Sequence, residues 1–176
     1  KSAFAGPEIK GKTLAVIGLG AIGRLVANAA VDLGMEVIGY DPFLTAELAE
    51  TLKKEVTVNN NLDEIFPVAD YITVHVPLTP ETKELICTAN IDKMKDTVRI
   101  LNFARGDLAN SADVVAALED GRMAAYVTDF PSADLIDIDG VIALPHLGAS
   151  TPESEENCAS MGALELIDFL ENGNIK

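Results

Sequence analysis

The stretch TLAVIGLGAIG, from Thr13 to Gly23, decides the fold of this chain. Its first half, Leu14 to Ile17, is a short unbroken apolar run, which is typical of a strand buried in a parallel sheet. The second half, Gly18 to Gly23, has the spacing G-x-G-x-x-G and comes directly after that strand. Apolar residues at helical spacing follow: Ile22, Leu25, Val26, Ala29, Ala30 and Leu33. The glycines therefore lie at a strand-to-helix turn, the setting in which this spacing indicates a dinucleotide site.

The three glycines have separate physical roles in such a turn. Gly18 permits the tight turn, Gly20 lets the backbone approach a pyrophosphate, and Gly23 lets the helix pack closely on its strand. The helix N-terminus, at Ala21 and Ile22, presents free N–H groups to an anion. A glycine-rich turn without a ligand is the alternative, because the spacing also occurs by chance.

An acidic residue follows the second expected strand. Residues 35–40 lead to Asp41, about 20 residues after the glycines, where a carboxylate accepts hydrogen bonds from a ribose diol. The same carboxylate would repel the 2′-phosphate of NADP, and residues 42–44 contain no Arg or Lys to offset that repulsion. An Asp that opens a turn before Pro42 is the alternative interpretation. Together, the glycines and Asp41 predict that the cofactor is NAD.

Composition and charge narrow the class of protein. With 176 residues, of which 48% are hydrophobic, the chain is expected to form one globular domain, residues 1–176. Its net charge of −15 argues against binding to nucleic acid or to an anionic membrane, which require clustered Lys and Arg. No apolar run is long enough to span a membrane and no signal peptide is visible, so we expect a soluble, cytoplasmic protein. The first residue is not Met, which suggests a piece of a longer protein.

The two cysteines, Cys87 and Cys158, are far apart in the sequence. They form no metal-ligand cluster with the two histidines, His75 and His146, so no metal site is expected. We expect both thiols to be reduced and buried.

Short apolar runs alternate with helical segments along the rest of the chain. This alternation predicts an α/β fold, a Rossmann-type doubly wound parallel sheet in three αβα layers. Further strands are expected at 56–58, 71–76, 98–103, 123–128 and 141–144, and helices at 45–53, 62–66, 91–94, 112–120 and 152–172. Ser111 and Thr151 are the expected N-caps of the last two helices. Ligands of such sheets bind at the carboxyl ends of the strands, so the residues after each strand are the candidates for a site.

These candidates include the three residue types that hydride transfer from a hydroxy acid requires. The reaction needs a cation for the substrate carboxylate, a base for the hydroxyl proton and a carboxylate that orients the base. Arg105 follows the strand at 98–103, His146 follows the last strand, and Asp129 or Asp134 lies between them in the sequence. The alternatives are a surface arginine in a polar turn and a structural histidine in a loop.

Six motifs in this order resemble those of the D-isomer-specific 2-hydroxyacid dehydrogenases. They are residues 18–23 (GLGAIG), 40–42 (YDP), 75–79 (HVPLT), 102–106 (NFARG), 128–131 (TDFP) and 145–151 (PHLGAST). The resemblance covers almost the whole chain and implies that Arg105 binds the substrate carboxylate and that His146 is the acid/base. It also implies an NAD site, with His75 as a lining residue, formed by Gly18, Gly20, Ala21, Ile22, Gly23, Asp41, His75, Val76, Pro77, Phe103, Ala104, Arg105, Asp129, His146, Gly148 and Ala149.

The chain departs from the family pattern at one position. Five residues after Asp129 the family usually has a Glu that pairs with the catalytic histidine, whereas this chain has Asp134. Asp134 is therefore the expected catalytic partner of His146, and Asp137 and Asp139 are the nearby alternatives.

The family's enzymes have a second, substrate-binding domain that the resemblance does not find in this chain. We therefore expect an excised NAD-binding domain that binds the cofactor with little or no turnover. Apolar surface that faces the other domain or a second subunit would then be exposed, so a homo-oligomer is expected.

Within the family, residues 126–131 and 145–151 are most similar to the enzymes that oxidise a phosphorylated three-carbon hydroxy acid in serine biosynthesis. The alternatives are enzymes that act on hydroxypyruvate, glyoxylate or D-lactate, and a non-catalytic NAD-sensing scaffold like the family's corepressors. The residues that distinguish among these lie mostly outside the chain.

Overall fold

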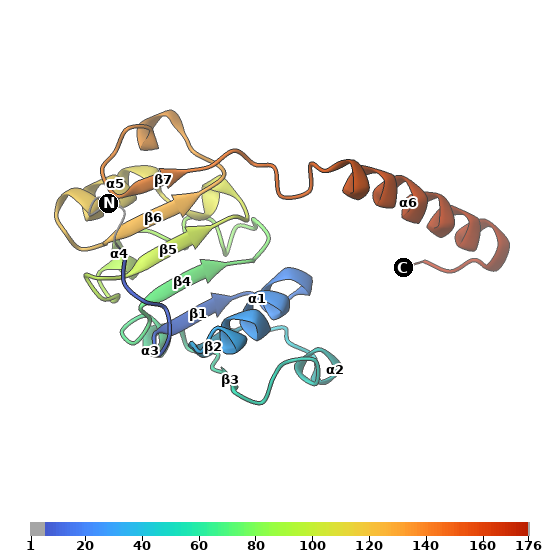
Figure 1. Cartoon of the computed structure of the whole chain (residues 1–176), viewed down its shortest axis with the longest axis horizontal. Helices are drawn as coiled ribbons and strands as arrows, with labels where there is room; N and C mark the ends of the chain where they lie inside the picture. Colours follow the sequence, from blue (N-terminus) through green and yellow to red (C-terminus); the bar gives the residue numbers. More distant parts are fainter. Residues whose placement is uncertain (1–5, 176) are drawn as a thin grey trace. The chain divides into compact units, whose positions relative to one another are not determined.

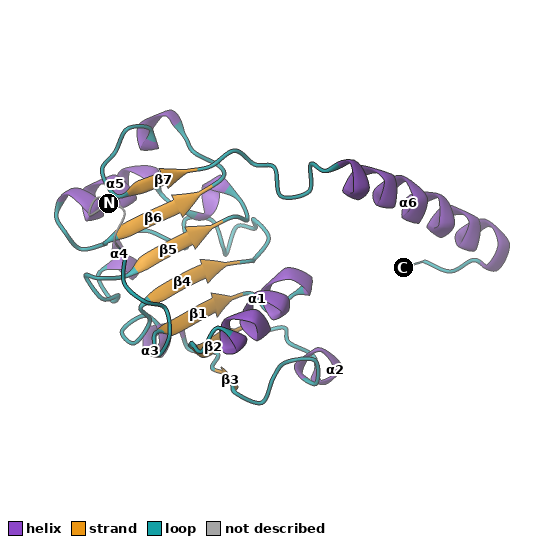
Figure 2. Ribbon diagram, in the orientation of Figure 1, coloured by secondary structure: helices purple, strands orange, loops and turns teal. Residues whose placement is uncertain are grey.

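The computed structural model describes residues 6–175, and the chain divides after Leu144 into two units (Figure 1). The first unit contains a seven-stranded sheet in which every neighbouring pair is parallel, in the order β3-β2-β1-β4-β5-β6-β7 (Figure 2). Its strands are β1 (Thr13–Ile17), β2 (Glu36–Tyr40), β3 (Val56–Val58), β4 (Tyr71–Val74), β5 (Arg99–Asn102), β6 (Ala125–Thr128) and β7 (Val141–Ala143). The predicted doubly wound α/β fold is confirmed.

Helices cover both faces of this sheet. Alternate residues of a strand point to opposite sides, so the apolar strands present an apolar surface on each face. Leu14 and Val16 of β1 belong to the cluster that contains Ala27 of α1, whereas Ala15 and Ile17 belong to the cluster on the other face. The α-helices of the first unit are α1 (Ala21–Asp32), α2 (Ala46–Ala49), α3 (Leu62–Ile65), α4 (Thr88–Ile91) and α5 (Ser111–Glu119). The second face is covered by buried residues of α3, α4 and α5. The core therefore lies in two layers, one on each side of β1.

The glycine turn after β1 has the geometry that its spacing predicts. Gly18 has a φ of +95°, a conformation that side chains rarely adopt. A Cβ on Gly23 would lie 1.9 Å from the carbonyl oxygen of Gly18, so α1 approaches the turn as closely as a helix can. The structure thus fixes two of the three glycine roles, the tight turn and the close helix packing.

Several element boundaries differ from the expected ones for local reasons. The strand expected at 71–76 ends at Val74, because its neighbour β1 ends at the paired Ile17. Asn110, not Ser111, caps α5, since its side chain accepts a hydrogen bond from the Asp113 amide at 3.1 Å. The helix expected at 91–94 lies at Thr88–Ile91.

The apolar residues of α1 that are spaced like a buried face are not all buried. The buried residues of α1 are Gly23, Ala27 and Ala30, whereas Ile22 and Leu25 are 66% and 70% exposed. The fully buried positions of this helix hold small residues, Val26 and Val31 are partly buried against the same cluster, and Ile22 and Leu25 point away from it.

The second unit begins at Pro145 and contains the helix α6 (Pro152–Asn172). Thr151 caps it as expected, by accepting a hydrogen bond from the Ser154 amide at 3.1 Å, and Gly173 ends it with a φ of +72°. Cys158 of this helix is exposed and Cys87 is half-buried, so the expectation of two buried thiols is wrong, although both are free. Among residues 6–175, none of the helices combines the length and apolarity that crossing a lipid bilayer requires.

Replacing Gly23 by Ala should destabilise the first unit. An Ala raises helix propensity by up to about 1 kcal/mol, but its Cβ would overlap backbone atoms, and overpacking of this kind costs about 1–3 kcal/mol. We expect the free energy of unfolding to fall by about 1–2 kcal/mol. The measurement is urea unfolding followed by tyrosine fluorescence, since all three tyrosines, Tyr40, Tyr71 and Tyr126, lie in the first unit.

Gly162→Ala is the matched control, because a Cβ on this glycine of α6 meets nothing within 4 Å. It should leave the tyrosine-detected midpoint unchanged. A Gly23→Ala chain as stable as the wild type would contradict the tight approach of α1 to Gly18.

Candidate functional site

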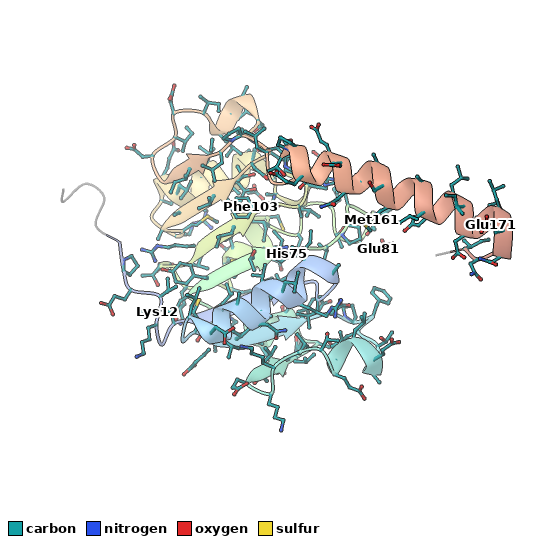
Figure 3. The ribbon with its side chains drawn as sticks, turned by 45° about the vertical axis from the view of Figure 1, so that its right-hand side comes forward. Lys12, His75, Glu81, Phe103, Met161 and Glu171 are labelled. Atoms are coloured by element: carbon teal, nitrogen blue, oxygen red, sulfur yellow. The ribbon has the colours of Figure 1, made fainter. Side chains whose placement is uncertain are left out.

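The candidate residues of the first unit gather at one edge of the sheet. Gly18, Asp41, His75, Phe103 and Asp129 each come directly after a strand, β1, β2, β4, β5 and β6 respectively. Because neighbouring strands are parallel, their carboxyl ends meet at the same edge. The strand order reverses between β1 and β4, which places the glycine turn and His75 on either side of the switch point. Figure 3 labels His75 and Phe103, which follow two adjacent strands.

The glycine turn leaves room for a phosphate against its backbone. A Cβ on Gly20 would meet nothing within 4 Å, and Gly20 caps α1 without a side-chain hydrogen bond. Both Gly20 and Ala21 are exposed. An uncapped helix N-terminus with an open glycine fits a pyrophosphate, which accepts hydrogen bonds from backbone N–H groups. The residues present therefore fit a dinucleotide.

Asp41 ties the glycine turn to the end of β2. One oxygen of its carboxylate, Oδ2, accepts a hydrogen bond from the Leu19 amide at 2.9 Å, and Oδ1 accepts one from the Phe43 amide at 2.9 Å. Each carboxylate oxygen has a further lone pair, so these two bonds leave acceptor capacity for hydroxyl groups. The half-buried Asp41 thus has a structural role as well as the predicted role toward a ribose.

His75 forms the other wall of the glycine turn. Its amide donates to the Ile17 carbonyl at 2.7 Å, and a Cβ on Gly18 would lie 2.8 Å from its carbonyl oxygen. The Nε2 atom of the ring lies 3.0 Å from the Thr73 hydroxyl, and burial lowers the pKa of His75. A neutral imidazole packed in this way agrees with a lining residue.

Arg105 lies in an exposed turn at the end of β5. Its guanidinium donates to the Ala104 carbonyl at 2.6 Å and lies 5.9 Å from the centre of the Phe130 ring. A pocket of about 380 Å³ opens beside this arginine. It is lined by Leu78, Arg105, Gly106, Asp107, Ala109, Ser111, Tyr126, Phe130, Pro131, Ser132 and Leu135. The Arg105 cation is thus one of the residues that line a small pocket, and a guanidinium can pair with a carboxylate there.

The acidic candidates occupy different positions. Asp129 is half-buried at the end of β6, whereas Asp134 is exposed in a short 3₁₀ helix, η3 (Ala133–Leu135). Asp137 has a φ of +61°, and Asp139 is exposed. The family resemblance pairs His146 with Asp134. His146 belongs to the second unit with Gly148 and Ala149, and all three are exposed. The pairing therefore stays a prediction.

The remaining lining residues have these positions. Ile22 and Phe103 are exposed large apolar side chains, Pro77 is exposed, and Val76 and Ala104 are half-buried. The part of the chain that the structure describes contains no group of three or more His, Cys, Asp or Glu side chains that could hold a metal ion.

Sequence reasoning missed a buried polar group beneath the Arg105 turn. The Asn102 side chain is fully buried and donates to the Arg105 carbonyl at 2.9 Å and to the Tyr126 hydroxyl at 3.0 Å. The sequence does contain a signal for this group, because Asn102 is a polar residue at the end of an otherwise apolar strand. A polar side chain that is buried there needs a hydrogen-bond partner.

Known proteins resemble this chain over most of its length. A family model described as "D-isomer specific 2-hydroxyacid dehydrogenase, NAD binding domain" matches residues 1–148. The chain is 43% identical to the D-3-phosphoglycerate dehydrogenase of Bacillus subtilis over 96% of this chain and 33% of the relative. It is 37% identical to that of Rattus norvegicus over 98% of this chain and 33% of the relative. The chain thus spans about a third of the length of these relatives.

A solved structure agrees with these sequence similarities. The D-lactate dehydrogenase with NAD+ from Lactobacillus jensenii matches with a TM-score of 0.85 at 28% identity. The match covers 99% of this chain and 57% of that one.

The burial of His75 predicts how stability depends on pH. Burial holds its pKa below the value of about 6.5 expected in the unfolded chain, so the unfolded state binds the proton more readily. The contribution of neutral His75 to stability is therefore fully present above pH 6.5 and declines as the pH falls below it. In urea unfolding between pH 8 and 5, the stability difference between wild type and His75→Gln should shrink toward low pH. A difference that is constant over this range would contradict the buried neutral ring.

Proposed function

Because this chain belongs to the D-isomer specific 2-hydroxyacid dehydrogenase family, as its NAD-binding domain, we propose that it is the cofactor-binding part of a D-3-phosphoglycerate dehydrogenase. The observation that carries the proposal is the 43% identity to such an enzyme over 96% of the chain. On this proposal residues 1–176 are the cofactor domain, and the substrate-binding domain lies elsewhere in a longer protein. The reaction is hydride transfer between 3-phosphoglycerate and NAD, giving 3-phosphohydroxypyruvate.

The cofactor is held mainly by backbone groups. The open N-terminus of α1 and the exposed Gly20 accommodate the pyrophosphate, and Asp41 accepts from the ribose hydroxyls. His75 and the turn at 103–105 line the nicotinamide side of the site, together with Asp129. The bound nicotinamide supplies the hydride acceptor.

Arg105 and His146 are the proposed catalytic residues. The Arg105 guanidinium pairs with the substrate carboxylate, which orients the carbon that loses the hydride. His146 takes the hydroxyl proton, and a carboxylate, proposed to be Asp134, keeps its imidazole oriented.

Two further proposals concern the setting of the enzyme. The substrate would place it in serine biosynthesis in the cytoplasm. Exposed apolar side chains support a homo-oligomer, because patches of this kind mark surfaces that contact another chain or domain. In α6 they are Met161, Leu164, Leu166, Ile167, Phe169 and Leu170.

Asp41 should make the chain prefer NADH to NADPH. Its carboxylate would lie beside the 2′-phosphate of NADPH, and like charges at such distances disfavour binding by more than 1 kcal/mol even when partly screened. We expect at least about a tenfold difference in Kd, which corresponds to about 1.4 kcal/mol, measured by NADH and NADPH fluorescence titration. Asp41→Asn should narrow the difference while it keeps one acceptor oxygen.

Glu36→Gln is the matched control, because this exposed residue at the opposite end of β2 carries the same charge. It lies about 16 Å away along the strand, beyond the screening length of about 8–10 Å. Equal Kd values for the two cofactors in the wild type would remove the role given to Asp41.

The proposed reaction is tested in the longer protein that contains this domain. NADH oxidation should be fastest, by kcat/KM, with 3-phosphohydroxypyruvate when it is compared with pyruvate, glyoxylate and hydroxypyruvate. Preference for an unphosphorylated acid would place the enzyme elsewhere in the family. Tight NADH binding without turnover of any of the four would indicate an NAD-sensing scaffold instead.

A further inference from the structure

Three polar side chains form a buried cluster where β5 and β6 end. Asn102 of β5 pairs in register with Thr128 of β6, and Tyr126 lies two residues earlier on the same face of β6. Asn102 and Thr128 are fully buried, and Tyr126 is 1% exposed. Polar groups that are buried in this way almost always have hydrogen-bond partners, so their contacts show what they hold in place.

The Asn102 amide lies at the centre of this cluster. Both of its N–H groups are used, one by the Arg105 carbonyl at 2.9 Å and one by the Tyr126 hydroxyl at 3.0 Å. Its Oδ1 accepts a hydrogen bond from the Ala104 amide at 3.2 Å. One side chain therefore holds both a donor and an acceptor of the turn that carries Arg105.

These contacts fix the backbone from which the Arg105 side chain extends. The Arg105 carbonyl also accepts from the Leu108 amide at 3.3 Å, at the start of the 3₁₀ helix η2 (Gly106–Leu108). The turn is thus held by hydrogen bonds with the Asn102 side chain and by a hydrogen bond with Leu108 of η2, which follows it in the sequence. The Arg105 side chain is exposed, and its guanidinium donates to the Ala104 carbonyl of the same turn, so the position of the turn affects where the guanidinium lies.

The Tyr126 hydroxyl is one of the three groups that orient the Asn102 amide, and it is the one that lies outside the turn. Because it accepts one N–H group, the other is directed to the Arg105 carbonyl and Oδ1 faces the Ala104 amide. Burial raises the pKa of Tyr126, so the phenol stays neutral. Without the hydroxyl, a buried N–H group of Asn102 loses its partner, which disfavours this arrangement of the amide.

We propose that Tyr126 is a positioning residue, whose hydroxyl holds Asn102 and, through it, the turn that presents Arg105 to the substrate carboxylate. The proposal rests on the role given to Arg105 under the proposed function. Tyr126 also lines the pocket beside Arg105, but in this role its hydroxyl acts through the hydrogen bond with Asn102.

Tyr126→Phe, made in the longer enzyme, removes the hydroxyl and keeps the ring. We expect kcat/KM for the 2-oxo acid to fall about 10- to 100-fold, as for a reacting group displaced by about 1 Å. The Kd for NADH should rise much less, because the glycine turn and Asp41, which hold most of the cofactor on our proposal, are not altered. Tyr71→Phe is the matched control, because Tyr71 lies at the amino end of β4, at the opposite edge of the sheet. It should leave both quantities at wild-type values. Unchanged kcat/KM in Tyr126→Phe, or a parallel loss of NADH binding, would overturn the proposal.

A double-mutant cycle with Arg105→Lys separates positioning from general damage. If Tyr126 acts through Arg105, Tyr126→Phe should change the residual kcat/KM of Arg105→Lys by less than about twofold. A full 10- to 100-fold loss in that background would show that Tyr126 acts independently of Arg105, and would overturn the proposal.

Hydrogen exchange of residues 102–106 tests the same contact without relying on turnover. Exchange at the Ala104 amide should be faster in Tyr126→Phe than in wild type or Tyr71→Phe, because the Asn102 acceptor is no longer held in place. Unchanged exchange would overturn the proposal. Faster exchange in an enzyme that Arg105→Lys leaves fully active would support the contact but refute the function proposed for Arg105.

Discussion

The contact between Gly23 and the Gly18 carbonyl is the constraint on which the rest of the first unit depends. No side chain fits between them, so α1 packs against the end of β1 at the distance its backbone allows. That approach directs the N-terminus of the helix toward the switch point between β1 and β4. His75 closes the turn from the other side, with its carbonyl 2.8 Å from where a Gly18 Cβ would lie. The packing of α1 and the binding of a dinucleotide therefore both require residues without a side chain at these positions.

A chain with a net charge of −15 is an unusual host for an anionic cofactor. The geometry explains how the two are compatible. On our proposal, the groups that face the phosphate are backbone N–H groups at a helix N-terminus, whose partial positive charge does not depend on the overall charge of the protein. Asp41, the acidic side chain next to the glycine turn, is directed to backbone amides and, on our proposal, to uncharged ribose hydroxyls. The acidic surface can thus coexist with a local anion site.

The sequence was sufficient for features that depend on local patterns. The glycine spacing and the apolar strands predicted the sheet, and with Asp41 after β2 they indicated the strand ends where the candidate residues gather. Packing detail was not accessible in the same way. Ile22 and Leu25 have helical spacing but point outward, whereas Gly23, Ala27 and Ala30 are the buried residues of the helix. A competition between adjacent polar residues gave the wrong cap, since Asn110 rather than Ser111 accepts the Asp113 amide.

The link between Asn102 and Tyr126 spans two strands, and no pattern within either strand reveals it. The partnership of Asp134 and His146 depends likewise on tertiary arrangement, so it remains a prediction. At the two borders of the sheet, β3 and β7 are only three residues long. A strand of another molecule could form few backbone hydrogen bonds with either border strand, so its addition to the sheet would be only weakly stabilised. The same shortness that ends the fold on each side therefore protects it from strand-to-strand aggregation.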